Sequence, residues 1–175
     1  MSTLRVALLR PVAPGLVLAL LTALYGFGLG IAFGLNEEAL QEVLTASAQA
    51  VSDTVYQGDA EKMKAITSKS WTYFKRAHMH AGALGTYALS ASQLLAFRSR
   101  VPTWARAAVS GLMGAGALGY SVFWLWAGLR APGLGSTGAA KESLAWLAMP
   151  SSGAVVVGTA LTLGLLVYEL ARKES

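Results

Sequence analysis

The 175-residue sequence contains no cysteine. This absence excludes disulfides, thiolate nucleophiles, iron–sulfur clusters and zinc sites built from cysteine. Charge is also scarce, since Asp, Glu, Lys and Arg make up only 13% of the residues, whereas soluble domains typically carry about 25%. Because 54% of the residues are hydrophobic and so few charged side chains are left to face water, the composition indicates a protein of the lipid bilayer.

Charged residues are missing altogether from four windows of 21 or more residues, which are Pro11–Asn36, Ala77–Phe97, Ala107–Leu129 and Ser143–Tyr168. A helix needs about 20 apolar residues to cross a hydrocarbon core of about 30 Å. In lipid only structures that satisfy their own backbone groups are stable, and a lone segment does so as a helix. We therefore predict an all-α integral membrane protein, a four-transmembrane-helix bundle that forms a single membrane domain over residues 1–175, with crossings at about 12–35, 77–97, 107–129 and 144–168.

The basic residues that flank the windows predict the orientation, because Lys and Arg are enriched in cytoplasmic connections. Three segments that share one side after four crossings carry Arg5, Arg10, Arg98, Arg100, Arg106, Arg172 and Lys173. We therefore expect both termini in the cytoplasm, residues 36–76 on the outer side, and the bacterial inner membrane as the location. The other side carries Arg130 and Lys141 in the last connection and a long first connection with six acids and five bases. Of these, Lys75 and Arg76 lie against the second window and argue against this orientation.

The first connection, residues 36–76, has the pattern of two amphipathic helices. Apolar residues recur three and four positions apart and form one helical stripe, which consists of Leu40, Val43, Leu44, Ala48, Val51 and Val55. Asn36 is the predicted N-cap of the first helix, Gly58 ends it, and Asp59 caps the second. The pattern predicts an extramembrane helical hairpin that lies on the outer membrane surface or packs on a partner.

Small residues recur four positions apart in three of the windows, a spacing that lets membrane helices approach closely. These faces are Gly26, Gly30 and Gly34, then Gly111, Ala115 and Gly119, then Ala154, Gly158 and Thr162. We expect them to seat neighbouring helices of the bundle. The alternative is contact with other membrane subunits or a second copy, through the Gly26/Gly30/Gly34 and Gly111/Gly119 faces.

The only two histidines, His78 and His80, lie at the outer mouth of the second window. Side chains two positions apart on a helix point about 200° away from each other, so they cannot hold one metal ion. If the helix begins only at about Ala81, an extended His78-Met79-His80 segment chelates one ion. Met149 is expected at a similar depth, and two imidazoles with a thioether suit copper. The candidate metal ligands are therefore His78, His80 and Met149.

Two other cofactors fit the same residues. A haem could be held by one histidine with Met149 or shared with another subunit, and a quinone could bind between one histidine and the outer tryptophans Trp124, Trp126 and Trp146. Alternatively, the histidines are interfacial polar residues that bond to headgroups or to the first connection. The cofactor therefore stays open among copper, haem, quinone and none.

Catalysis by the chain alone is not expected, because the sequence contains no nucleophile, phosphate-loop or metalloprotease motif in its required context. Apart from His78 and His80 at the mouth of the second window, the windows lack the ionisable residues of pumps. We therefore expect a non-catalytic accessory or assembly subunit of a larger membrane complex, respiratory or related to transport, with no nucleic-acid partner. The first alternative is a metal-, haem- or quinone-binding membrane protein. A weaker one is a small channel or transporter with its site at a break in the fourth helix at Pro150.

Overall fold

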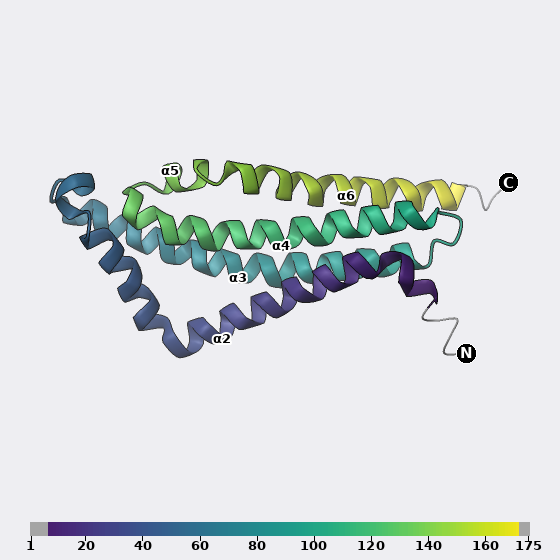
Figure 1. Cartoon of the computed structure of the whole chain (residues 1–175), viewed down its shortest axis with the longest axis horizontal. Helices are drawn as coiled ribbons and strands as arrows, with labels where there is room; N and C mark the ends of the chain where they lie inside the picture. The colour runs from purple at the N-terminus through teal and green to yellow at the C-terminus, as the bar shows by residue number, and fades with distance from the viewer. Residues whose placement is uncertain (1–6, 172–175) are drawn as a thin grey trace.

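The computed structural model describes residues 7–171, which form helices joined by short turns and contain no strand. Figure 1 shows the long helices α2 (Ala13–Gln49), α3 (Ala60–Ala96), α4 (Thr103–Leu134) and α6 (Ala145–Ala171), together with the short α5 (Thr137–Glu142). Three helical segments, Ala7–Gln49, Thr103–Leu134 and Ala145–Ala171, are long and apolar enough to cross a membrane. The prediction of an all-helical chain compatible with a bilayer is confirmed. Helix α3 does not belong to this apolar set.

The long helices alternate in direction. As a result, the beginning of α2, the connection between α3 and α4 and the end of α6 lie together at one end (Figure 1). We call this the arginine end, after Arg98 and Arg106, and the opposite end, which carries residues 50–59, the hairpin end. These are the three segments that the flanking basic residues predict to share one side. Among those residues, Arg5, Arg172 and Lys173 lie outside the described residues.

Helix α4 is the central helix of the bundle. Half of its most apolar stretch is buried within the protein, whereas only 17% is buried in the corresponding stretches of α2 and α6. Its small residues allow this central position, because a Cβ on Gly116 would lie 2.6 Å from the Ser151 carbonyl oxygen of α6. A Cβ on Gly114 would lie 3.0 Å from the Gly15 carbonyl oxygen of α2. Close backbone approach of this kind holds helices together in lipid, where burial of apolar surface gives no driving force.

The glycine faces predicted from the sequence seat helices of the same chain at most of their positions. On α2, Gly26 packs against Ala81 and Gly30 lies beneath the His78 ring, while Gly34 has no atom within 4 Å of a built Cβ. The remaining close contacts are those of Gly119 with Ser151, Gly158 with Met113 and, at 3.9 Å, Gly111 with Pro14. Contact of these faces with a second copy or another subunit stays a prediction, and Gly34 is the open position among them.

Helix α2 bends at Asn36, whose backbone angles (φ −137°, ψ 31°) are not helical. The interruption predicted at Asn36 is therefore present, but its side chain donates to the Ala32 carbonyl oxygen and does not cap the following turn. Figure 1 shows α2 diverging from the bundle up to this bend and then returning towards the start of α3. The predicted cap at Asp59 is confirmed, since its carboxylate accepts the Lys62 N–H at 2.9 Å.

The part of α2 after the bend packs on its own chain through the predicted apolar stripe. Leu44 is 1% exposed and Ala48 is fully buried. The turn η2 (Ser52–Tyr56) follows, and the Tyr56 hydroxyl donates to the Pro132 carbonyl oxygen at the end of α4 at 2.6 Å. The stripe is therefore used at Leu44 and Ala48 to close the hairpin end, whereas Val43 is 56% exposed.

Helix α6 runs without interruption through Pro150. The Ser152 hydroxyl donates to the Ala148 carbonyl oxygen at 2.8 Å, and Ser151 is buried against Gly119. The break that the channel or transporter alternative assumed at Pro150 is absent, since the helix continues on both sides of the proline. The channel or transporter alternative therefore loses the feature from which it was argued.

Candidate functional site

The two histidines face different helices, because α3 is continuous from Ala60 to Ala96. His78 reaches α2, where its Nδ1 donates to the Gly26 carbonyl oxygen at 2.8 Å. Its ring also lies against Phe33, with 6.3 Å between ring centroids. The extended His78-Met79-His80 segment that joint chelation requires is not formed, and the regular helix turns the two imidazoles apart.

His80 faces α4. Its Nδ1 donates to the Arg76 carbonyl oxygen at 2.7 Å, and its ring stacks on Trp124 with centroids 5.9 Å apart. Because a carbonyl oxygen only accepts, the proton of each neutral histidine is on Nδ1 and the lone pair is on Nε2. Each histidine can therefore offer one nitrogen to a ligand, at separate places on α3.

The remaining predicted cofactor residues are mostly at the surface. Met149 is 72% exposed, Trp146 65% and Trp126 44%, and only Trp124 is buried. Within residues 7–171, no three histidine, aspartate or glutamate side chains gather into a group that could hold a metal ion. The structure brings His80 and Trp124 together, whereas His78 points towards α2.

Trp124 is the centre of an aromatic cluster between α3 and α4. The Arg76 guanidinium lies 4.8 Å from the centre of its ring, and the edge of Tyr73 packs against it with centroids 4.9 Å apart. A guanidinium over an indole contributes about 0.5–2 kcal/mol, depending on its exposure to water. The Trp124 Nε1 is buried and has no hydrogen-bond partner among the described residues. The cluster therefore fixes α3 to α4 near the hairpin end and leaves one donor unused.

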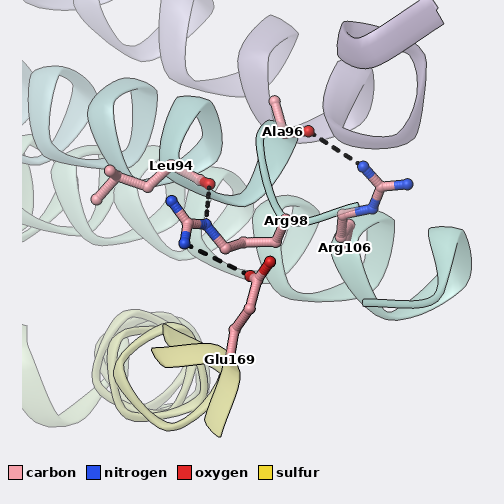
Figure 2. Close-up of polar contacts among 5 residues, drawn as sticks. All are labelled: Leu94, Ala96, Arg98, Arg106 and Glu169. Atoms are coloured by element: carbon pink, nitrogen blue, oxygen red, sulfur yellow. Dashed lines mark hydrogen bonds and ion pairs between the residues drawn. The ribbon is translucent and has the colours of Figure 1, made fainter. Parts of the chain in front are cut away.

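A charged cluster lies at the arginine end, where α3, α4 and α6 meet (Figure 2). Arg98 Nη1 lies 3.5 Å from the Glu169 carboxylate of α6, and its Nε donates to the Leu94 carbonyl oxygen at 3.3 Å. Arg106 is 8% exposed and donates to the Ala96 carbonyl oxygen at 3.1 Å. Two guanidinium groups thus satisfy carbonyls that the last turn of α3 leaves without helical partners, and cations are favoured at this end of a helix dipole.

From the sequence, Arg98 and Arg106 are flanking charges only, and Glu169 is the first charged residue after the window Ser143–Tyr168. The available signal was that Arg98 and Glu169 end two windows on the same predicted side. Arg98 and Glu169 are therefore expected at the same end of the bundle, but several other basic residues lie at this end and any of them could pair with Glu169. The pairing itself depends on how α6 is rotated on α4, which the one-dimensional pattern does not contain.

A second feature absent from the sequence analysis is an outward strip on α3, made of Gly82, Thr86, Ser90 and Gln93. A Cβ built on Gly82 would have no atom within 4 Å, and the other three residues are exposed. The Ser90 hydroxyl donates to the Thr86 carbonyl oxygen of its own helix at 3.0 Å. These residues are four, four and three positions apart, so the strip is a small, polar ridge along one side of α3.

No family model, curated protein or solved structure matches this chain.

Proposed function

We propose that the chain is a non-catalytic accessory or assembly subunit of a larger membrane complex, and that α3 is its fourth crossing. Residues 77–96 of α3 have the length of a span, about 30 Å at 1.5 Å per residue. Several polar groups of this segment are turned inward. Ser92 is fully buried, and His78 bonds to α2. Inward polar groups reduce the hydropathy of a helix without exposing those groups to lipid, which supports a crossing by α3.

The observation that carries this proposal is the outward strip Gly82/Thr86/Ser90/Gln93. If residues 77–96 of α3 cross a bilayer, the exposed Thr86 hydroxyl faces its hydrocarbon core, and the exposed Gln93 amide faces lipid in the last turn of the crossing. A polar group without a partner in hydrocarbon costs several kcal/mol. A transmembrane helix of another subunit would satisfy the amide, and Gly82, Thr86 and Ser90 are small enough to let its backbone approach. The strip is therefore the surface that we assign to the partner.

The orientation and location belong to the same proposal. The arginine end faces the cytoplasm and the hairpin end lies outside, because Lys and Arg are retained on the cytoplasmic side. The proposed location is the bacterial inner membrane. Arg98, Arg100 and Arg106 support this orientation, whereas Lys75 and Arg76 oppose it and Arg130 and Lys141 also lie on the outer side. Since the chain has no cysteine, single cysteines at residues 57 and 99, labelled from either side of intact vesicles, test it without background labelling.

The matched substitutions Gly82→Leu and Gly164→Leu test the partner surface. Both glycines lie on long helices, and neither would bring a Cβ within 4 Å of another atom, so both variants are expected to fold. Affinity purification from native membranes in mild detergent, followed by mass spectrometry, reports the partners of each variant. We expect Gly82→Leu to lose a membrane subunit that the wild type and Gly164→Leu retain.

Gln93→Leu is the second variant, because it removes the amide but keeps the size of the side chain. It is expected to weaken the same association and to leave α3 folded. Recovery of an identical set of subunits with wild type, Gly82→Leu and Gln93→Leu would overturn the assignment of this surface. Purification of the wild-type chain free of other subunits would overturn the accessory role.

The second candidate function is binding of a haem or quinone at His80. It is favoured by the stacking of His80 on Trp124, since His80 Nε2 and the unpartnered Trp124 Nε1 are two polar groups of one cluster. The optical spectrum and extracted quinone content of protein from native membranes test it. His80→Ala should remove the cofactor and His78→Ala should retain it, whereas protein without haem or quinone argues against this function.

A further inference from the structure

The hairpin end contains a groove of about 370 Å³ between the part of α2 after the bend and the first part of α3. Its walls are helical on both sides. Its lining includes Leu44 on α2 and Met63, Lys64, Ser68 and Trp71 on α3. Ligand pockets in proteins typically occupy about 300–1,000 Å³, so the groove has room for a small molecule.

The groove is held open at both of its ends. At the hairpin tip, the buried Tyr56 hydroxyl bonds to the Pro132 carbonyl oxygen at 2.6 Å. Near the bend, the Phe33 ring of α2 packs on Trp71 of α3 with centroids 5.3 Å apart. Between these contacts the bend at Asn36 keeps the two helices apart. A cavity fixed in this way is preformed, and a ligand would not need to reorganise its walls.

The lining has two chemical parts. Met63 and Trp71, which are partly exposed, supply the accessible apolar surface above the buried Leu44, and Lys64 supplies the one charged side chain of the lining. Ser68 is exposed and lies four positions after Lys64, on the same face of α3. Its hydroxyl has no hydrogen-bond partner among the described residues, and no described carboxylate lies within ion-pair distance of Lys64. An ammonium and a free hydroxyl next to apolar side chains suit an anionic group that carries a hydrocarbon chain.

We propose that this groove binds a small amphiphilic anion. Its phosphate or carboxylate contacts Lys64 and Ser68, and its apolar chain lies on Met63 and Trp71. The acidic side chains Glu38 and Glu42 do not line the groove itself, but they line the adjoining surface of α2, which shares Gln41 and Thr45 with the groove. The site does not depend on the α3 strip or its partner, so either proposal can fail without the other.

The test uses the full chain in lipid nanodiscs, titrated calorimetrically with hexyl phosphate and, separately, with octanoate. Nanodiscs without protein provide the blank for partition into lipid. Saturable 1:1 binding of at least one probe is expected. Lys64→Gln should weaken it about tenfold or more, because a hydrogen bond to a charged group is lost. Lys69→Gln is the matched control, since Lys69 is exposed on the same helix and outside the groove, and it should bind like the wild type.

Two further probes separate the parts of the ligand. Inorganic phosphate has the charge without the chain, hexyl glucoside has the chain without the charge, and each should bind at least tenfold more weakly than hexyl phosphate. Unchanged helical circular dichroism shows that a variant is folded. The proposal is overturned if neither charged probe binds above the blank, if Lys64→Gln binds like the wild type, or if inorganic phosphate binds as tightly as hexyl phosphate.

Discussion

The bond between Tyr56 and Pro132 is a suitable point at which to test how the hairpin end is held. Tyr56 is 2% exposed, and its hydroxyl donates at 2.6 Å to a carbonyl oxygen 76 positions along the chain. Tyr56→Phe keeps the ring and removes only the hydroxyl. If this bond fastens the hairpin to α4, its loss should increase local opening of residues 50–59 and leave the rest of the bundle unchanged.

The structure sets the size of the effect. A hydrogen bond contributes about 0.5–1.5 kcal/mol net, and a buried group left without a partner adds a further penalty. Here the Pro132 carbonyl oxygen keeps a second bond from the Gly135 N–H at 3.2 Å, so no acceptor is abandoned. We therefore expect a loss of about 1 kcal/mol, which corresponds to roughly fivefold more opening.

Hydrogen–deuterium exchange of the protein in nanodiscs measures this opening, because exchange through local unfolding follows its equilibrium constant. The matched control is Tyr87→Phe, which removes a hydroxyl that donates to Thr159 Oγ1 at 2.7 Å between α3 and α6. Exchange of residues 50–59 should rise about fivefold in Tyr56→Phe and stay at the wild-type rate in Tyr87→Phe. Equal protection of these residues in Tyr56→Phe and the wild type would refute the anchoring role.

The Tyr56 hydroxyl should also make the stability of the protein depend on pH. Burial raises the pKa of the Tyr56 phenol above its ordinary value of about 10. The protonated form is therefore favoured by folding, and its contribution is complete below pH 10 and is lost as the pH rises through the folded-state pKa. The difference in melting temperature between wild type and Tyr56→Phe should shrink between pH 9 and 11. A difference in melting temperature that is independent of pH across this range would show that folding does not raise the pKa of the Tyr56 phenol.

Three further tests concern the packing of the bundle. A double-mutant cycle of Arg98→Ala and Glu169→Gln should give a coupling of about 1 kcal/mol in detergent unfolding, because Glu169 is 9% exposed in a pair at 3.5 Å, and zero coupling would contradict this. Gly116→Ala should lower stability by about 1–3 kcal/mol, because its Cβ would meet a carbonyl oxygen of α6 at 2.6 Å. Gly164→Ala, which meets no atom within 4 Å, should not lower it. His78→Phe should cost about 1 kcal/mol through loss of the 2.8 Å bond to α2, and its thermal unfolding in detergent measures this.

The sequence by itself determined the helical, membrane-compatible character of the chain. Long stretches without charge are stable in lipid only if the backbone bonds within each segment, so composition and spacing are sufficient for this inference. Local signals were also sufficient at Asp59, whose carboxylate caps the next turn. At Asn36 they indicated an interruption but the wrong cap, and α2 ends at Gln49, before the predicted end at Gly58. These features depend on a few neighbouring residues, which the sequence lists in order.

The tertiary structure alone decided how the helices are rotated about their axes. Rotation turns His78 towards α2 and His80 towards α4, pairs Arg98 with Glu169, and leaves Gly82 and Gln93 on the outside. Helix α6 also continues on both sides of Pro150, where the channel or transporter alternative assumed a break. The physical reason is that small-residue contacts between helices are short-ranged and specific to position, and hydropathy averaged along a segment does not contain them.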